Sequence, residues 1–203
     1  MRDIEVFADI VCPFTHVGLR RLVEARAARG YTSVLRVRAW PLEWINGHPV
    51  ERDLAAREIG ALRTSVAPDL FKGFEVATWP RTSLPAFGLV AAAYAVDDAT
   101  GAQVSLAVRT ALFEDGLDIA DPEVINSIGS TYGVDSLDPS ATRAAVESDW
   151  ERGKAHGAQG SPHFFVGDAD WFCPSLDIRH DGDEFSIKIA SESMSEFYDA
   201  VFA

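Results

Sequence analysis

The stretch "FADIVCPFTHVG", residues 7–18, indicates how the fold begins. Its first residues belong to "IEVFADIV", residues 4–11, whose β-branched and aromatic side chains are typical of a buried strand. From Pro13 to Arg29 the pattern becomes helical, and Pro13 suits a first helical turn because its missing N–H has no partner there. The sequence therefore predicts a strand and a helix with Cys12 between them.

The elements that follow predict an α/β protein with a helical block inserted into one sheet. Residues 33–42, "SVLRVRAWPL", alternate as a second strand, which a right-handed crossover would place parallel to the first. After a polar loop at 45–53, the predicted helices are 51–63, 68–76, 84–96, 102–114, 121–132 and 140–156. Strand patterns return at 163–167, 171–173 and 184–190, predicted as one hairpin with a loop at 174–183, before a last helix at 191–202.

Composition narrows the class of protein. The chain has 203 residues with 18 basic and 31 acidic side chains, a formal net charge of −13. This charge disfavours general nucleic-acid binding and binding to anionic membranes, since both need positive surface. The first residues do not have the pattern of a signal peptide, and two cysteines are too few for a disulfide framework, so we expect a cytoplasmic protein.

Cys12 has two interpretations. At the start of a helix, unpaired N–H groups and the positive end of the helix dipole favour a thiolate. The thiol pKa can then fall from about 8.5 to roughly 3.5–7.5, and the Thr15 hydroxyl stands at the spacing where it could donate to the sulfur. Free cysteines are also commonly buried as packing residues. Cys12 alone does not decide between a nucleophile and a structural residue.

A second motif, "GAQGSPHFFV", residues 157–166, precedes the returning strand. Pro162 cannot pair in mid-sheet, so it belongs to a strand edge or a special turn. Together with "FADIVCPFTHVG" and the helical block between the two motifs, it resembles the DsbA-like branch of the thioredoxin superfamily, which includes kappa-class glutathione transferases and 2-hydroxychromene-2-carboxylate isomerases. The resemblance covers most of the chain.

The resemblance implies a thioredoxin fold with an inserted all-helical domain, divided at residues 1–45, 46–156 and 157–203. It implies that Cys12 is the nucleophile, that the Ser161–Pro162 bond is cis, and that its backbone holds the substrate. We expect Cys12 and Thr15 to be catalytic. The residues expected to contact the substrate are Pro13, Phe14, His16, Ser161, Pro162 and His163.

One departure from the family pattern limits the chemistry. The family's resolving cysteine is replaced by Thr15, so no disulfide can form within the motif. The single thiol predicts a thiol oxidoreductase that exchanges mixed disulfides with a protein or a low-molecular-weight thiol such as glutathione, with no bound cofactor. A thiol-dependent isomerase or glutathione-transferase-like enzyme, and a non-catalytic binding module on the same fold, stay open. The sequence also leaves a homodimer open.

Further side chains surround these motifs. Cys173 is a candidate substitute for the missing resolving thiol, although packing in "WFCP" is the simpler interpretation. His16 could tune Cys12, and no ligand spacing predicts a metal site. We expect a substrate cleft between the thioredoxin part and the helical block. Aromatic candidates for its lining are Phe14, Trp40, Trp44 and Phe87, although packing in the core is the simpler interpretation for most of them.

Overall fold

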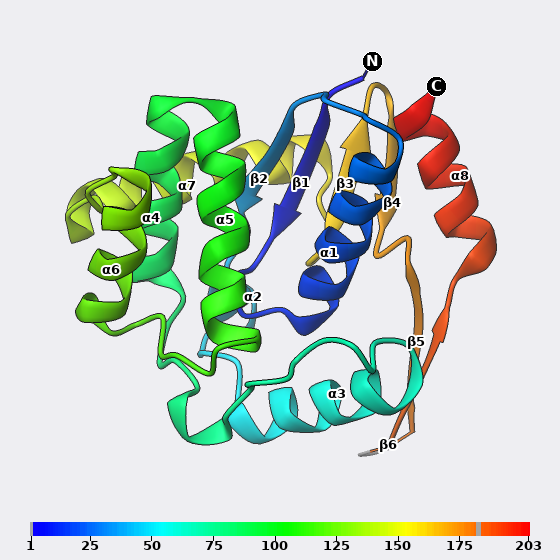
Figure 1. Ribbon diagram of the computed structural model, residues 1–203, viewed down its shortest axis with the longest axis horizontal. Helices are drawn as coiled ribbons and strands as arrows, with labels where there is room; N and C mark the ends of the chain where they lie inside the picture. The colour runs from blue at the N-terminus through cyan, green and yellow to red at the C-terminus, as the bar shows by residue number, and fades with distance from the viewer. Residues whose placement is uncertain (1, 182–183) are drawn as a thin grey trace.

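A four-stranded mixed sheet organises the protein, whose computed structural model describes residues 2–181 and 184–203. The strands β1 (Ile4–Ala8), β2 (Leu35–Ala39), β3 (His163–Val166) and β4 (Ala169–Phe172) lie in the order β2-β1-β3-β4. β1 and β2 are parallel and are joined by α1 (Pro13–Ala28), as predicted (Figure 1). The α/β class with a helical block between two halves of one sheet is confirmed.

The register of β1 and β3 decides where the two sequence motifs meet. These strands are antiparallel, with Phe7 opposite His163. The last residue of β1 and the first residue of β3 therefore lie next to each other, at the same end of these two central strands. Because the first motif follows β1 and the second precedes β3, the sheet brings together two segments that are far apart in the sequence (Figure 1).

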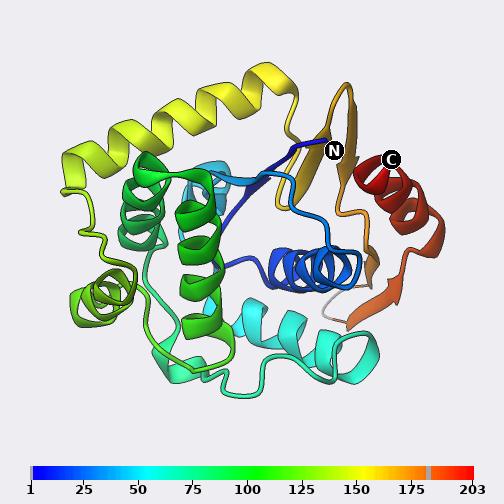
Figure 2. The same ribbon diagram turned by 45° about the horizontal axis from the view of Figure 1, so that its top comes forward.

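The helical block consists of α2 (Leu42–Asn46), α3 (Arg52–Ser65), α4 (Leu84–Val96), α5 (Asp98–Phe113), α6 (Pro122–Tyr132) and α7 (Pro139–His156), with a 3-10 turn, η1 (Val76–Thr78). Figure 2 shows α7 running back from this block toward the sheet. Asp97, Asp121 and Asp138 cap α5, α6 and α7 by accepting hydrogen bonds from backbone N–H groups of the first turn. The division at residues 45/46 and 156/157 stays a prediction.

Two predictions in this block are wrong. Residues 68–76 form no α-helix, because the Glu114 carboxylate accepts the backbone N–H groups of Phe71 and Lys72, and Phe71 has a positive φ of 61°. The loop predicted at 45–53 begins later than expected, since α2 extends through Asn46.

The C-terminal strands also differ from the prediction. β5 (Leu176–Asp181) and β6 (Glu184–Ile189) form a second, separate hairpin, whereas residues 174–183 were predicted as a loop. Residues 182 and 183 of that loop lie outside the described residues. The alternation of Leu176 and Ile178 with polar neighbours is a strand pattern, and Ile178 pairs with Ile187 on β6. The last helix, α8 (Ser191–Phe202), has its predicted bounds.

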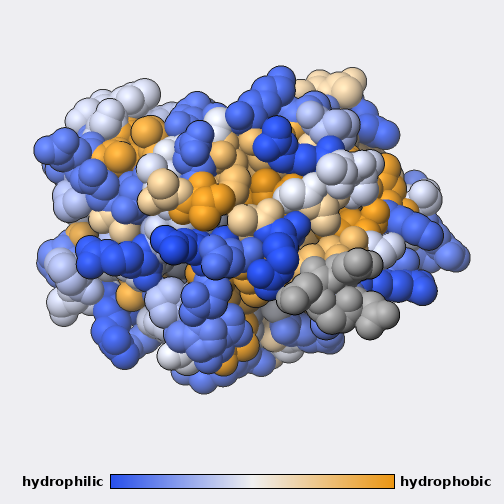
Figure 3. Space-filling model, turned by 90° about the horizontal axis from the view of Figure 1, so that it is seen from below, coloured by the Kyte–Doolittle hydropathy of each residue, from blue (hydrophilic) through white to orange (hydrophobic). Residues whose placement is uncertain are grey.

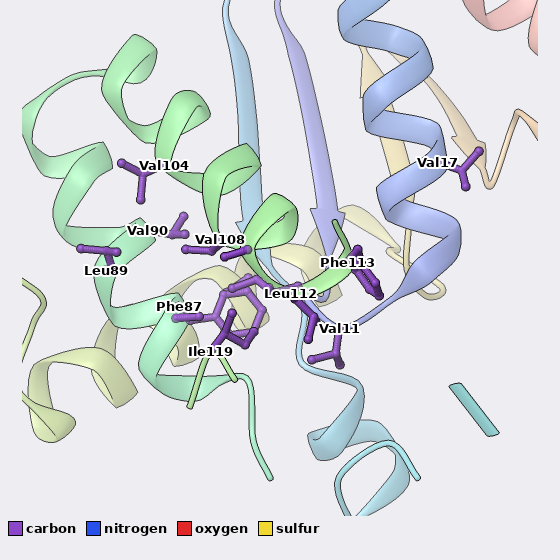
Figure 4. Packing of buried hydrophobic residues seen from close by; sticks show 14 of the residues in the cluster. Val11, Val17, Phe87, Leu89, Val90, Val104, Val108, Leu112, Phe113 and Ile119 are labelled. Carbon is purple, nitrogen blue, oxygen red and sulfur yellow. The ribbon is translucent and has the colours of Figure 1, made fainter. Parts of the chain in front are cut away.

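Buried side chains form two clusters. One lies where α1 and α8 pack on the sheet and includes Val6, Leu19, Phe164 and Phe197. The larger one fills the helical block, where Phe87, Val108 and Leu112 lie close together between α4 and α5 (Figure 4).

The surface on the side of α3 mixes many hydrophilic side chains with separate apolar patches (Figure 3). Among the described residues, we find no helix with the length and apolar character needed to cross a membrane.

Candidate active site

Cys12 is the N-cap residue of α1, with Pro13 as the first helical residue. Its backbone is extended, with φ −79° and ψ 113°, and its carbonyl accepts the hydrogen bond from the His16 N–H at 3.2 Å. The side chain is only 2% exposed. The predicted position of this thiol between strand and helix is confirmed, and the thiol is covered in this structure.

The second motif lies directly against the thiol. The Cys12 Sγ donates to the Ser161 carbonyl oxygen at 3.2 Å, and the peptide bond from Ser161 to Pro162 is cis. The Ser161 hydroxyl accepts from the Asp9 N–H at 2.8 Å and lies 2.9 Å from the Thr15 hydroxyl. These hydrogen bonds join the end of β1, the start of α1 and the start of β3 into one buried polar cluster.

The expected low pKa of Cys12 is contradicted. Burial raises the pKa of this thiol, and this effect exceeds the opposing hydrogen bonds from Thr15 and Ser161. The negative charge of Glu58, on α3, acts in the same direction as burial. A thiolate here would lose its hydration, and neither the helix N-terminus nor its attraction to the buried Arg109 guanidinium offsets that loss.

Glu58 is a further ionisable group of this site. Burial raises the pKa of its carboxyl to about 7, and Arg57 acts in the opposite direction. Figure 1 shows α3 running below the start of α1, and α3 contacts both α1 and β6. Glu58 can therefore change its charge near neutral pH within electrostatic range of Cys12.

The family follows from a comparison with known sequences. A model of the DSBA-like thioredoxin domain matches residues 3–178 of the chain. The chain belongs to the DSBA-like thioredoxin family. The search among curated proteins found no match.

Solved structures support the fold of this DSBA-like protein. It is similar to the cytosolic disulfide reductase DsbM from Pseudomonas aeruginosa, with a TM-score of 0.62 and 16% identity over 98% of this chain and 95% of DsbM. It is also similar to 2-hydroxychromene-2-carboxylate isomerase, with a TM-score of 0.61 and 18% identity over 83% of this chain and 87% of the isomerase. At such identities the likeness establishes the fold, and the chemistry has to be argued from the site.

The two histidines predicted to contact the substrate are each 1% exposed and bonded within the DSBA-like chain. His16 Nε2 lies 2.7 Å from Glu114 Oε1, and burial lowers the pKa of His16 despite this carboxylate. His163 Nδ1 accepts from the Gln159 N–H at 3.0 Å, and its Nε2 lies 2.8 Å from Asp170 Oδ1. A buried imidazole needs partners for both nitrogens, and His163 finds them in the segments that hold the Ser161–Pro162 loop.

The aromatic residues predicted to line a cleft divide into two groups. Trp40 is 4% and Phe87 is 3% exposed, so both are packed in the core, the role that the sequence favoured for most of these residues. Trp40 stacks on Trp150 with ring centroids 4.2 Å apart. Phe14 and Trp44 are half-buried against the core cluster that contains Phe87. Pro13 and Pro162 are buried as well.

Two charged residues of the site were missed by the sequence analysis. Asp9 is 0% and Arg109 is 1% exposed. The Asp9 carboxylate accepts backbone N–H groups from Val11 at 3.2 Å and from Leu42 at 2.6 Å, and Arg109 donates to the Asp9 carbonyl at 3.2 Å. Asp9 in "FADIV" and Arg109 in "LAVRTALF" are lone charges within apolar runs, which is the signal that could have found them.

Metal ligands are not grouped in the described part of the chain, where no set of three or more His, Cys, Asp or Glu side chains is arranged to hold an ion.

Proposed function

We propose that the protein is a thiol oxidoreductase in which Cys12 exchanges with disulfides. The observation that carries the proposal is the position of Cys12 at the start of α1, with its Sγ 3.2 Å from the Ser161 carbonyl in a DSBA-like chain. In the step proposed, the Cys12 thiolate attacks a disulfide RSSR, a Cys12–S–S–R bond forms, and the leaving RS⁻ takes up a proton.

Glutathione is the thiol that we propose as the co-substrate. The comparison structure DsbM is described as a cytosolic disulfide reductase and has also been solved with GSH. A cytoplasmic location would supply this thiol at high concentration. The exchange needs no further bound group, because the electrons come from the thiols themselves.

The buried state of Cys12 has a consequence for the reaction. At 2% exposure the sulfur cannot meet a disulfide in line, so the covering segments must move before exchange. Residues that would then meet the substrate include Ser161 and Pro162, whose backbone lies against the sulfur, and Phe14, which is half-buried. Thr15 would stabilise the exposed thiolate through its hydroxyl, which already interacts with the sulfur and lowers its pKa.

The test is oxidation by glutathione disulfide followed by mass spectrometry. Reduced protein is incubated with glutathione disulfide, the remaining thiols are alkylated, and peptides containing Cys12 and Cys173 are quantified. We expect Cys12 to lose its free thiol in the wild type, while Cys173 stays free in the Cys12→Ser variant.

A Cys12 thiol that stays free under these conditions would refute the proposal. Glutathione-dependent isomerisation without net oxidation would then favour an isomerase or transferase. If Cys12→Ser keeps the function of the wild type, including ligand binding, a non-catalytic binding module would be favoured.

A further inference from the structure

The two cysteines of the chain lie against consecutive residues of the same loop. Cys12 Sγ donates to the Ser161 carbonyl at 3.2 Å, and the Cys173 N–H donates to the next carbonyl, that of Pro162, at 2.9 Å. Cys173 directly follows β4, whose last residue, Phe172, pairs with His163. The antiparallel β3–β4 hairpin thus returns the chain to the end of the strands where Cys12 lies.

The backbone of Cys173 is unusual. Its φ is +46°, and among the described residues only Phe71 is another non-glycine residue with a positive φ. A left-handed conformation destabilises a residue with a Cβ by about 1–2 kcal/mol; glycine has no such penalty, and asparagine tolerates the conformation better than most residues. Packing alone gives no reason for cysteine at such a position, where a glycine would relieve the strain. Strained backbone of this kind is concentrated at functional sites.

The two thiols also interact electrostatically. Burial raises the pKa of Cys173 to about 12, and the negative charge of a Cys12 thiolate adds to the effect. Both cysteines are buried and free in this structure. The pair can therefore carry one negative charge far more easily than two, so Cys173 stays protonated while Cys12 is the thiolate.

We propose that Cys173 is the resolving thiol of Cys12, in the role that Thr15 cannot fill. This inference rests on the proposed function, because it begins from the mixed disulfide Cys12–S–S–R. The Cys173 sulfur attacks the Cys12 sulfur, the bond from Cys12 to R breaks, and R leaves as a thiolate that takes up the proton from Cys173. A Cys12–Cys173 disulfide forms, and the disulfide RSSR that began the sequence has been reduced to two thiols.

Formation of the mixed disulfide removes one of the two effects that raise the pKa of Cys173, and burial, the larger effect, remains. Once Cys12 is bonded to R, it no longer carries a charge, and the electrostatic repulsion that disfavours a Cys173 thiolate is gone. The two Cα atoms must come within about 7 Å to form the bond. Cys173 lies outside the β3–β4 ladder, in the short connection between β4 and β5, so it can move without breaking a strand.

The experiment follows the fate of the mixed disulfide. Wild type, Cys173→Ser, Cys173→Ala and Cys12→Ser proteins are treated with glutathione disulfide, quenched with acid at a series of times, and analysed by intact mass and peptide mapping. We expect the wild type to form a Cys12–Cys173 disulfide with little glutathione adduct. Both Cys173 variants should accumulate an adduct on Cys12 at least about tenfold above the wild type.

Two results would overturn the inference. If wild type and both Cys173 variants accumulate the same adduct on Cys12, Cys173 does not resolve it, and the proposed function stands without this step. If Cys12 forms no adduct in any protein, the proposed function fails and the inference fails with it. Two substitutions are used because serine can retain a hydrogen bond that alanine cannot, and circular dichroism of each variant verifies its fold.

Discussion

Replacing Asp9 tests whether the buried polar cluster beneath the site holds the fold together. The Asp9 carboxylate is fully buried and accepts two backbone N–H groups, from Val11 at 3.2 Å and Leu42 at 2.6 Å. Asp9→Ala leaves both donors buried without a partner, at about 1–3 kcal/mol each. It also removes the negative charge near the buried Arg109 guanidinium, whose hydrogen bond to the Asp9 backbone carbonyl is kept.

We therefore expect Asp9→Ala to lower the free energy of unfolding by about 2–6 kcal/mol, the sum for the two unpaired donors. For a domain of this size, this corresponds to a fall in Tm of roughly 10 °C. Asp9→Asn keeps one acceptor oxygen and should lose about 1–3 kcal/mol. The assay is urea unfolding followed by far-UV circular dichroism. The control is Asp135→Asn at an exposed carboxylate, which should change stability by less than about 0.5 kcal/mol.

The same variants have a pH signature. Burial raises the pKa of Asp9, despite hydrogen bonds from Leu42, Val11 and Ser83. The folded state therefore binds a proton at Asp9 more tightly than the unfolded chain does, so the contribution of this group becomes less favourable as the pH rises above about 4. Asp9→Asn should remove that part of the pH dependence. An Asp9→Ala protein within about 1 kcal/mol of the wild type would refute the reasoning.

Three further predictions concern other parts of the chain. Burial lowers the pKa of His16, so the stabilising contribution of this residue is present above about pH 6.5 and is lost as the pH falls below this value. Between pH 7 and 5 the Tm of His16→Gln should therefore fall less than that of the wild type, and an equal fall in Tm for both proteins would contradict this. Gly153→Ala should lower the free energy of unfolding in urea by about 1–3 kcal/mol, because the new Cβ would lie 2.4 Å from Trp40 Cζ3, whereas Gly60→Ala, whose Cβ would have nothing within 4 Å, should raise it by up to about 1 kcal/mol. A Gly153→Ala protein as stable as the wild type would count against the packing argument. Thr15→Cys should form a disulfide with Cys12 in glutathione disulfide, detected by peptide mapping, and its absence would argue against exchange chemistry at Cys12.

Local signals made several elements predictable. α4 and α8 have their predicted bounds, 84–96 and 191–202, and α6 and α7 begin after the capping residues Asp121 and Asp138. A cap, a proline in the first turn and an apolar periodicity act within a few residues, so they can be recognised without knowledge of the rest of the fold.

Long-range contacts account for the errors. The pattern of residues 68–76 predicts a helix, but in the structure the Glu114 carboxylate accepts two of their backbone N–H groups. These N–H groups are 43 and 42 residues from Glu114 in the sequence. β5 was mistaken for a loop because its charged residues concealed the alternation of Leu176 and Ile178, and its partner β6 contacts α3. The contact with Glu114 has no signature within residues 68–76, whereas the alternation in β5 is a local signal that was overlooked.

The sequence by itself determined the α/β order of elements, the place of Cys12 at a helix start and, through the resemblance, the motif at Ser161 and Pro162. Only the tertiary structure decided the state of the thiol. Its burial, its hydrogen bond to a carbonyl 149 residues away, the charge of Glu58 and the return of Cys173 to Pro162 all depend on the sheet bringing distant segments together. A pKa is set by the solvent and charges around a group, and these are properties of the assembled fold that no short stretch of sequence contains.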